Sequence, residues 1–144
     1  MVAGEGARPC AAGYGAVTGR ADAAVRHDGT GQWVKCKSAD TVGPTGPWLV
    51  TRDEVADCGA LGLWLEVDGH RYQNGSTRTL VFGVPYLVSY LSRFMSLQPG
   101  DIISTGTPPG VGLGQKPPVY LRAGNVMRLG VHGLGEQQQT VVAE

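Results

Sequence analysis

Long apolar runs are missing from this 144-residue sequence, and none could cross a membrane as a helix. No charged segment followed by an apolar one opens the chain, so no signal peptide is predicted. Neither sign of charge is in excess, since 12 Lys and Arg balance 12 Asp and Glu and no block of like charge occurs. The sequence therefore predicts neither a membrane partner nor a nucleic-acid partner.

Cysteine and histidine are also scarce. The cysteines form no pair at metal-ligand spacing, and their odd number is typical of free thiols in a reducing compartment: Cys10, Cys36 and Cys58. We therefore expect a cytoplasmic protein, or a protein of the mitochondrial matrix in a eukaryote. The histidines are too scattered to argue for a metal site: His27, His70 and His132. The other candidate ligands for a hard ion such as Mg²⁺ are single carboxylates: Asp22, Asp40 and Asp101.

Glycine and proline are abundant instead. The counts of 23 Gly and 9 Pro favour a turn-rich, β-heavy fold over a helical bundle. A hydrophobic content of 42% with 17% charged residues is typical of a globular protein. We predict one β-rich, mixed α+β domain over residues 32–144, with roughly seven or eight short strands and one long helix. Residues 1–31 are expected to form a degenerate, poorly ordered N-terminal segment.

Short alternating or apolar segments predict the strands. The clearest is 61–67, where leucine and valine alternate with other residues before a hairpin turn at Asp68-Gly69. The other expected strands are 13–17, 33–38, 48–50, 70–73, 102–103, 119–121, 126–131 and 140–142. Asn74-Gly75 predicts a further turn, and Thr51 with Glu54 a capping box that begins a helical turn. The long helix begins near Pro85, with apolar residues at helical spacing over 84–95.

A loop of glycine, threonine and proline follows the apolar pair Ile102-Ile103 and extends to Gly114. Glycine lets a ligand approach the main chain closely, and the stretch Thr105-Gly106-Thr107 adds two hydroxyl groups. The loop lacks the Gly-Lys-Ser or Gly-Lys-Thr ending of a phosphate loop. By itself it predicts an anion-binding loop of unspecified kind.

Two other polar clusters could carry chemistry. In 35–41 a lysine ammonium either holds a carboxylate or enolate, or belongs to a solvated strand edge. In 74–79 Arg78 stands among hydroxyls that either bind an anion or begin a helix. The residues alone leave two classes open, an enzyme and a structural or interaction module.

Four stretches of the sequence resemble the C-terminal part of the fumarylacetoacetate hydrolase family: GQWVKCKSADTVGPTGPWLVTRDEV, WLEVDGHRYQNGSTRTLVFGV, YLVSYLSRFMSLQPGDIISTGTPPGVG and YLRAGNVMRLGVHGLGEQ. The second is closest to the subgroup called ureidoglycolate lyase or 2,4-diketo-3-deoxy sugar-acid hydrolase. The resemblance implies a mixed β-roll, a homodimer, and a divalent ion, Mg²⁺ or else Mn²⁺ or Ca²⁺. It also implies a small carboxylate substrate, a keto acid or a ureidoglycolate-like molecule, cleaved at a C–C or C–N bond through a metal-stabilised enolate.

The resemblance assigns roles to individual residues. Lys37 matches the lysine beside the metal, and Thr107 the threonine that contacts substrate, so both are expected to be catalytic. Thr105 and Gly106 are expected to bind substrate with Thr107. Asp22 matches the aspartate that ligates the metal, and Thr41 a residue that binds a second cation in some members.

The N-terminal region departs from the family pattern. The family places a Glu-x-Glu pair of metal ligands and a histidine loop upstream of the strand that contains Gly13-Tyr14, and neither is found there. We therefore expect an N-terminally truncated family member and an incomplete β-roll. The alternative to an active enzyme is an inactive remnant that acts only as a folding or dimerisation module.

Overall fold

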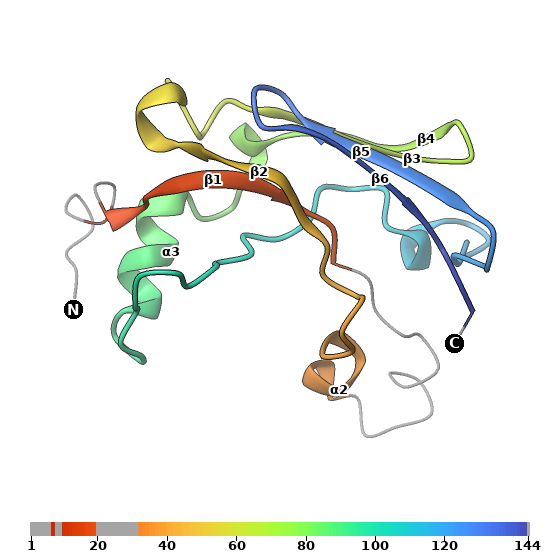
Figure 1. The fold of residues 1–144 in the computed structure, drawn as a ribbon, viewed down its shortest axis with the longest axis horizontal. Helices are drawn as coiled ribbons and strands as arrows, with labels where there is room; N and C mark the ends of the chain where they lie inside the picture. Colours follow the sequence, from red (N-terminus) through yellow and green to blue (C-terminus); the bar gives the residue numbers. More distant parts are fainter. Residues whose placement is uncertain (1–6, 8–9, 20–31, 144) are drawn as a thin grey trace.

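The computed structural model of the chain describes residues 7, 10–19 and 32–143. Within these residues a two-stranded and a four-stranded sheet lie side by side, and α2 and α3 extend away from them (Figure 1). In chain order the elements, with η for a single 3-10 turn, are β1 (Gly13–Val17), α2 (Trp33–Lys37), β2 (Thr45–Thr51), η2 (Arg52–Glu54), β3 (Gly62–Val67), β4 (His70–Ser76), η3 (Thr77–Thr79), α3 (Val84–Leu91), η4 (Gly112–Gly114), β5 (Val126–Val131) and β6 (Gly135–Thr140). The β-rich, mixed α+β class is confirmed. The division at residue 31 stays a prediction.

The four-stranded sheet has the order β4-β3-β5-β6, with every neighbouring pair antiparallel. The predicted turn at Asp68-Gly69 joins β3 to β4, with φ of 49° and 81° at its two residues. The Asp68 carboxylate also accepts hydrogen bonds from the Val126 amide at 2.8 Å and from Asn125 Nδ2 at 2.6 Å. The turn is therefore tied to the start of β5, the central strand beside β3.

Cross-strand pairing arranges the inner face of this sheet in rows. One row consists of Gln73, Leu65, Leu129 and Gln137. The next consists of Gly75, Leu63, Val131 and Gly135. Leucine and valine in the middle of both rows make this the apolar face, and Met127 and Leu129 on it are only 2% and 6% exposed. The polar or small residues at the row ends are free to contact other parts of the chain.

The outer face of the same sheet is charged. Arg71 forms an ion pair with Glu66 at 2.6 Å, and Arg128 one with Glu136 at 3.5 Å. The Trp64 ring lies beneath both guanidinium groups, 4.4 Å from the Arg71 carbon and 5.9 Å from the Arg128 carbon. Alternation along β3 thus separates an aqueous face from the apolar one.

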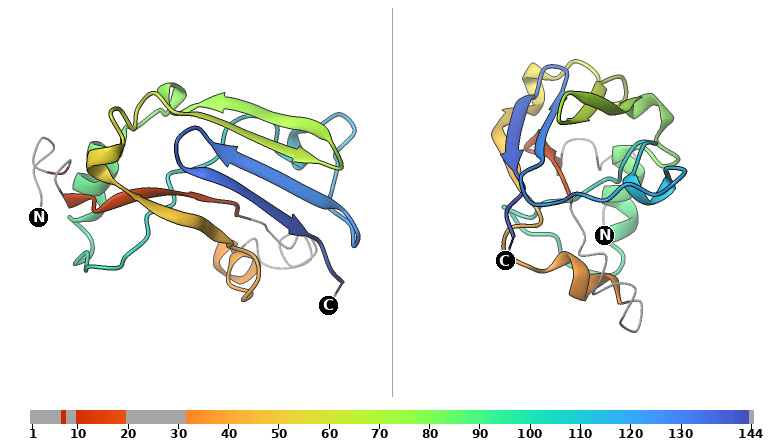
Figure 2. Two further views of the ribbon diagram at one scale, coloured as in Figure 1. Left: turned by 45° about the horizontal axis from the view of Figure 1, so that its top comes forward. Right: turned by 90° about the vertical axis from the view of Figure 1, so that its right-hand side faces the viewer.

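The β1–β2 ribbon lies against the inner edge of β6 (Figure 2). Gln137 Nε2 donates to the carbonyl oxygens of Ala16 in β1 and Gly46 in β2. At the end of the next row, the ring of Pro47 sits on Gly135, where an added Cβ would lie 2.7 Å from the proline Cγ. One polar and one apolar contact therefore join the two sheets.

The segment 33–38, predicted as a strand, instead forms helix α2 over Trp33–Lys37. In so short a segment, alternation and a single helical turn have similar patterns, so local contacts decide. Ser38 Oγ donates to the Val34 carbonyl at 2.6 Å and Cys36 Sγ to the Trp33 carbonyl at 3.2 Å. Only Cys36 is buried in α2.

Other predicted boundaries differ from the structure. Asn74-Gly75 is not a turn, because β4 continues through both residues in register with β3. The segments 102–103 and 119–121 form no strand, and Ile102 is 72% exposed. The last strand covers Gly135–Thr140 rather than 140–142. Six strands are found in the part of the chain that the structure describes, fewer than predicted.

The predicted helical turn after Thr51 is present as η2. The Thr51 side chain caps no backbone amide, and its hydroxyl lies 3.4 Å from Glu54 Oε1. The hydrogen bond from the Thr51 side chain lowers the pKa of the Asp53 carboxyl, helped by the Asp53 amide and the Arg52 charge.

Helix α3 begins at Val84 with Pro85 in its first turn, as predicted, and ends at Leu91, before the end of the apolar pattern. Four exposed aromatic rings follow one another along the helix at four-residue spacing, with neighbouring centroids 4.7 to 6.0 Å apart: Phe82, Tyr86, Tyr90 and Phe94. Within the described residues, no helix is long and apolar enough to span a membrane.

We predict that Gln137→Ala lowers the free energy of unfolding by about 1–3 kcal/mol, because it leaves two partly buried carbonyls without their donor. The measurement is urea unfolding followed by circular dichroism. Gln138→Ala is the matched control, since Gln138 is the exposed neighbour on the other face, and a change within about 0.5 kcal/mol is expected. Equal effects of the two substitutions would contradict the role of Gln137.

Candidate functional site

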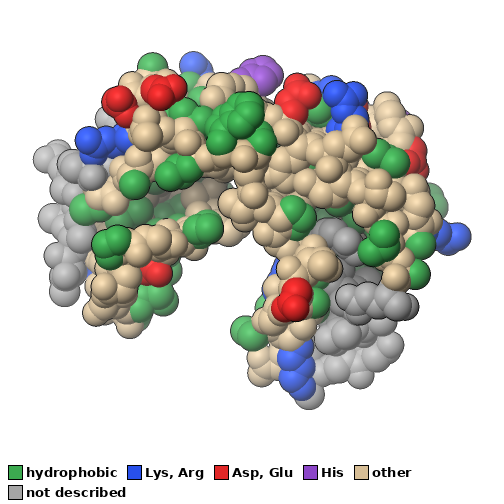
Figure 3. All heavy atoms as spheres, viewed as in Figure 1, with side chains coloured by type: hydrophobic (Ala, Val, Ile, Leu, Met, Phe, Trp, Pro, Cys, Tyr) green, Lys and Arg blue, Asp and Glu red, His purple; other side chains and the backbone are tan. Residues whose placement is uncertain are grey.

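The molecule is hollowed on one side, between the part that contains α3 and the part that contains α2 (Figure 3). In this view the segment after α3 crosses above the hollow on its way to η4. That segment contains the loop predicted to bind an anion. The hollow is therefore the candidate site.

The loop is fastened to β4. Gln73 Nε2 donates to Thr107 Oγ1 at 3.1 Å and to the Pro108 carbonyl at 3.2 Å. The Pro108 ring lies on Gly75, where an added Cβ would be 2.7 Å from the proline Cβ. Side-chain and van der Waals contacts thus hold two consecutive loop residues on the edge strand of the sheet.

Gly110 brings the loop main chain onto β4. Its φ is 108°, in the left-handed region, and an added Cβ would overlap the carbonyl group of Tyr72. Beyond it, the Val119 amide donates to the Gly112 carbonyl at 2.9 Å and closes the far end around η4. The loop is therefore anchored from Thr107 to Gly112.

The part of the loop that leads into these anchors presents Thr105, Gly106 and Thr107 to solvent. Gly106 has φ of 116°, which turns the backbone between the two threonines. Hydroxyls and backbone amides are neutral hydrogen-bonding groups that suit carboxylate or enolate oxygens. The three predicted substrate-binding residues therefore form one continuous exposed segment.

Lys37 is placed on another element, at the C-terminal end of α2. Its ammonium group donates to the Gly19 carbonyl at 3.2 Å, and its side chain is exposed. Thr41 is exposed in the connection between α2 and β2. Among the described residues, the recorded hydrogen bonds join neither Lys37 nor Thr41 to the loop, so the predicted site residues form two separate groups.

Asp22, the predicted metal ligand, lies outside the described residues, as do Arg26 and His27. Within the ranges that the structure describes, no three His, Cys, Asp or Glu side chains come together as a metal site would require. The described residues therefore do not by themselves fit a divalent ion.

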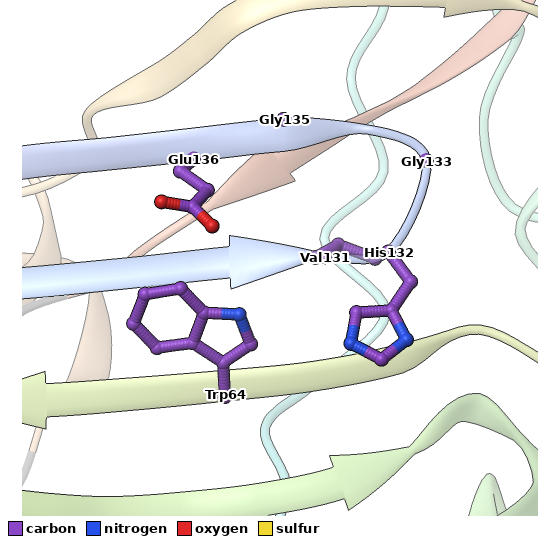
Figure 4. A pocket seen from close by; sticks show the side chains of 6 residues that line it. All are labelled: Trp64, Val131, His132, Gly133, Gly135 and Glu136. Carbon is purple, nitrogen blue, oxygen red and sulfur yellow. The ribbon is translucent and has the colours of Figure 1, made fainter.

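A further depression lies on the charged outer face of the four-stranded sheet (Figure 4). Its lining consists of Trp64, Val131, His132, Gly133, Gly135 and Glu136. The His132 ring stands against Gly62, and the Glu136 carboxylate lies near the Trp64 ring. None of the residues predicted to bind substrate or metal lines it.

Comparison with known proteins identifies the family. The sequence model described as "Fumarylacetoacetate (FAA) hydrolase C-terminal" matches residues 7–142. The chain belongs to the fumarylacetoacetate hydrolase family. The resemblance of its sequence motifs to that family is thereby confirmed.

Relatives of known structure share the fold. Fumarylacetoacetate hydrolase from Exiguobacterium antarcticum superposes with a TM-score of 0.94 at 35% identity, over 99% of this chain and 51% of that one. Maleylpyruvate hydrolase from Sphingobium sp. SYK-6, in complex with manganese(II) and pyruvate, superposes with a TM-score of 0.80 at 35% identity. The match covers 98% of this chain and 48% of that one. A Burkholderia multivorans protein with a hydrolase name is 70% identical over 110 residues, 76% of this chain and 39% of that protein. The chain therefore spans about half, or less, of the length of these relatives.

The sequence missed two residues that shape this family member's loop. Gln73 is predicted only as the end of a return strand, because no local pattern shows that a residue 34 positions later contacts it. Gly110 is one of several glycines in the loop, and its contact with Tyr72 arises only in the folded chain. Both contacts join segments that are distant in the sequence, so no local pattern reveals them.

We predict that Gly110→Ala detaches the loop from β4, because the new Cβ overlaps the Tyr72 carbonyl and φ is positive. The expected loss of unfolding free energy is about 1–3 kcal/mol, measured by urea unfolding. Faster limited proteolysis within 104–114 should accompany it.

Gly114→Ala is the matched control. An added Cβ at Gly114 meets nothing within 4 Å, so we expect near wild-type stability and proteolysis. The close approach of loop and strand would be refuted if both variants behaved alike.

Proposed function

We propose that the protein takes part in a divalent-metal-dependent hydrolase or lyase reaction on a small carboxylate, a keto acid or a ureidoglycolate-like molecule. The observation that carries this proposal is the anchored segment Thr105-Gly106-Thr107 at the hollow, in a member of the fumarylacetoacetate hydrolase family. The related maleylpyruvate hydrolase with manganese and pyruvate supports both the metal and the substrate class. A reaction that cleaves a C–C or C–N bond through an enolate is consistent with this loop segment and with a divalent ion.

Each group has a role that suits its chemistry. The hydroxyls of Thr105 and Thr107 and the Gly106 amide would bind substrate oxygens, and the anchor at Thr107 would limit reorganisation as negative charge develops. The Lys37 ammonium has three N–H donors, of which the Gly19 carbonyl uses one. The remaining donors would stabilise the enolate from the side of α2.

The proposed cofactor is Mg²⁺, or Mn²⁺ or Ca²⁺ in its place. The described residues do not by themselves assemble a set of ligands for such an ion. Asp22, outside the described residues, is the proposed ligand, and Thr41 would contact a second cation.

We also propose a cytoplasmic homodimer, or one in the mitochondrial matrix in a eukaryote. The buried thiols of Cys36 and Cys58, which form no disulfide, suit a reducing compartment. Large apolar side chains at the surface, such as Val81 at 88% and Phe94 at 68% exposure, support burial against another chain.

An inactive folding or dimerisation module is the second candidate function. The observation that favours it is that no three metal-ligating side chains meet within the described ranges. Such a module would keep the fold and the exposed apolar surface without binding a substrate.

Calorimetric titration of the chain with oxalate in the presence of Mn²⁺ separates the two functions. Oxalate mimics the enolate, so the enzyme proposal expects saturable binding, and an absence of binding supports the inactive module. We predict that Thr107→Val weakens this binding about 10- to 100-fold, the effect of removing a hydrogen bond to a charged group.

Thr140→Val is the control for that experiment. Thr140 is exposed at the end of β6, away from the loop, so we expect unchanged oxalate affinity. Loss of binding in both variants would show that the effect is not specific to the loop.

A further inference from the structure

The carboxamide of Gln73 stands directly behind the Thr107 hydroxyl. Both amide protons are used, since Nε2 lies 3.1 Å from Thr107 Oγ1 and 3.2 Å from the Pro108 carbonyl oxygen. Turning the amide over would place Oε1 against that carbonyl, which is also an acceptor. The Pro108 contact therefore fixes which end of the amide faces Thr107.

This fixed donor determines the direction of the threonine hydroxyl. A hydroxyl has one proton to donate and two lone pairs that accept. Because Gln73 Nε2 can only donate, Thr107 Oγ1 must accept, and its own proton is left for another partner. Thr107 is exposed, so that partner comes from a bound molecule or solvent rather than from the protein core.

We propose that Gln73 is a positioning residue that makes Thr107 a hydrogen-bond donor toward an oxygen anion of the substrate. This inference rests on the proposed function and names the preference of the same site. The free hydroxyl proton favours a carboxylate or enolate oxygen at the point that Thr107 contacts.

The surroundings of Gln73 keep the arrangement rigid. Gln73 pairs with Leu65 in the β3–β4 ladder, so its backbone cannot follow a displaced loop. On the loop side, Pro108 rests on Gly75, and Gly110 rests on the Tyr72 carbonyl. The hydrogen-bond direction is thus set by packing on both sides of the amide.

Two substitutions test the direction of the hydrogen bond by oxalate titration with Mn²⁺. Gln73→Met removes the donor at similar size and should weaken binding about 3- to 10-fold. Gln73→Glu should weaken it further, by about 30-fold or more, since a carboxylate accepts the hydroxyl proton and repels the anion. Gln138→Met and Gln138→Glu, on the exposed outer face of β6, are the matched controls and should bind as wild type does.

A double-substitution cycle separates positioning from a merely structural role. When Thr107→Val is already present, Gln73→Met should change oxalate affinity less than about 2-fold, because no hydroxyl is left to orient. The proposal would be overturned if Gln73→Met weakened oxalate binding equally with and without Thr107→Val. It would also be overturned if both Gln73 variants bound oxalate with wild-type affinity. Absence of binding by the wild-type chain would overturn the proposed function and this role together, whereas wild-type binding with unaffected Gln73 variants would overturn only this role.

Discussion

The contact between the 104–114 loop and strand β4 is the constraint on which the candidate site depends. Main chain meets main chain at Gly110 and Tyr72, and an amide side chain meets two loop oxygens beside it. Contacts this close leave little freedom for Thr107. A segment without regular secondary structure can therefore present fixed hydrogen-bonding groups, which a mobile loop could not do.

The inner face of the four-stranded sheet organises both ends of the molecule by the same means. In one row Gln73 holds the loop and Gln137 holds the β1–β2 ribbon, with two leucines between them. In the next row the end glycines receive Pro108 and Pro47. The loop and the ribbon are therefore both positioned by contacts with one face of the sheet. Their relative position depends on the register of β3, β4, β5 and β6, because a shift in register would move these contact residues.

The described residues include the proposed substrate-binding segment but only part of the proposed metal ligands. The proposed substrate side of the site is the exposed segment around Gly106. The proposed metal ligands are Asp22, outside the described residues, and Thr41, which is exposed. The chain also spans about half of the length of the solved relatives.

The sequence by itself determined the features that depend on neighbours along the chain: the β3 alternation, the Asp68-Gly69 turn, the Pro85 start of α3, the exposed Thr105-Gly106-Thr107 segment and the family. Tertiary structure decided the rest. Whether 33–38 becomes helix, whether Asn74-Gly75 stays in a strand, and which donor faces Thr107 all depend on contacts between distant segments. Local patterns cannot encode these, because the competing conformations have similar local energies and only packing separates them.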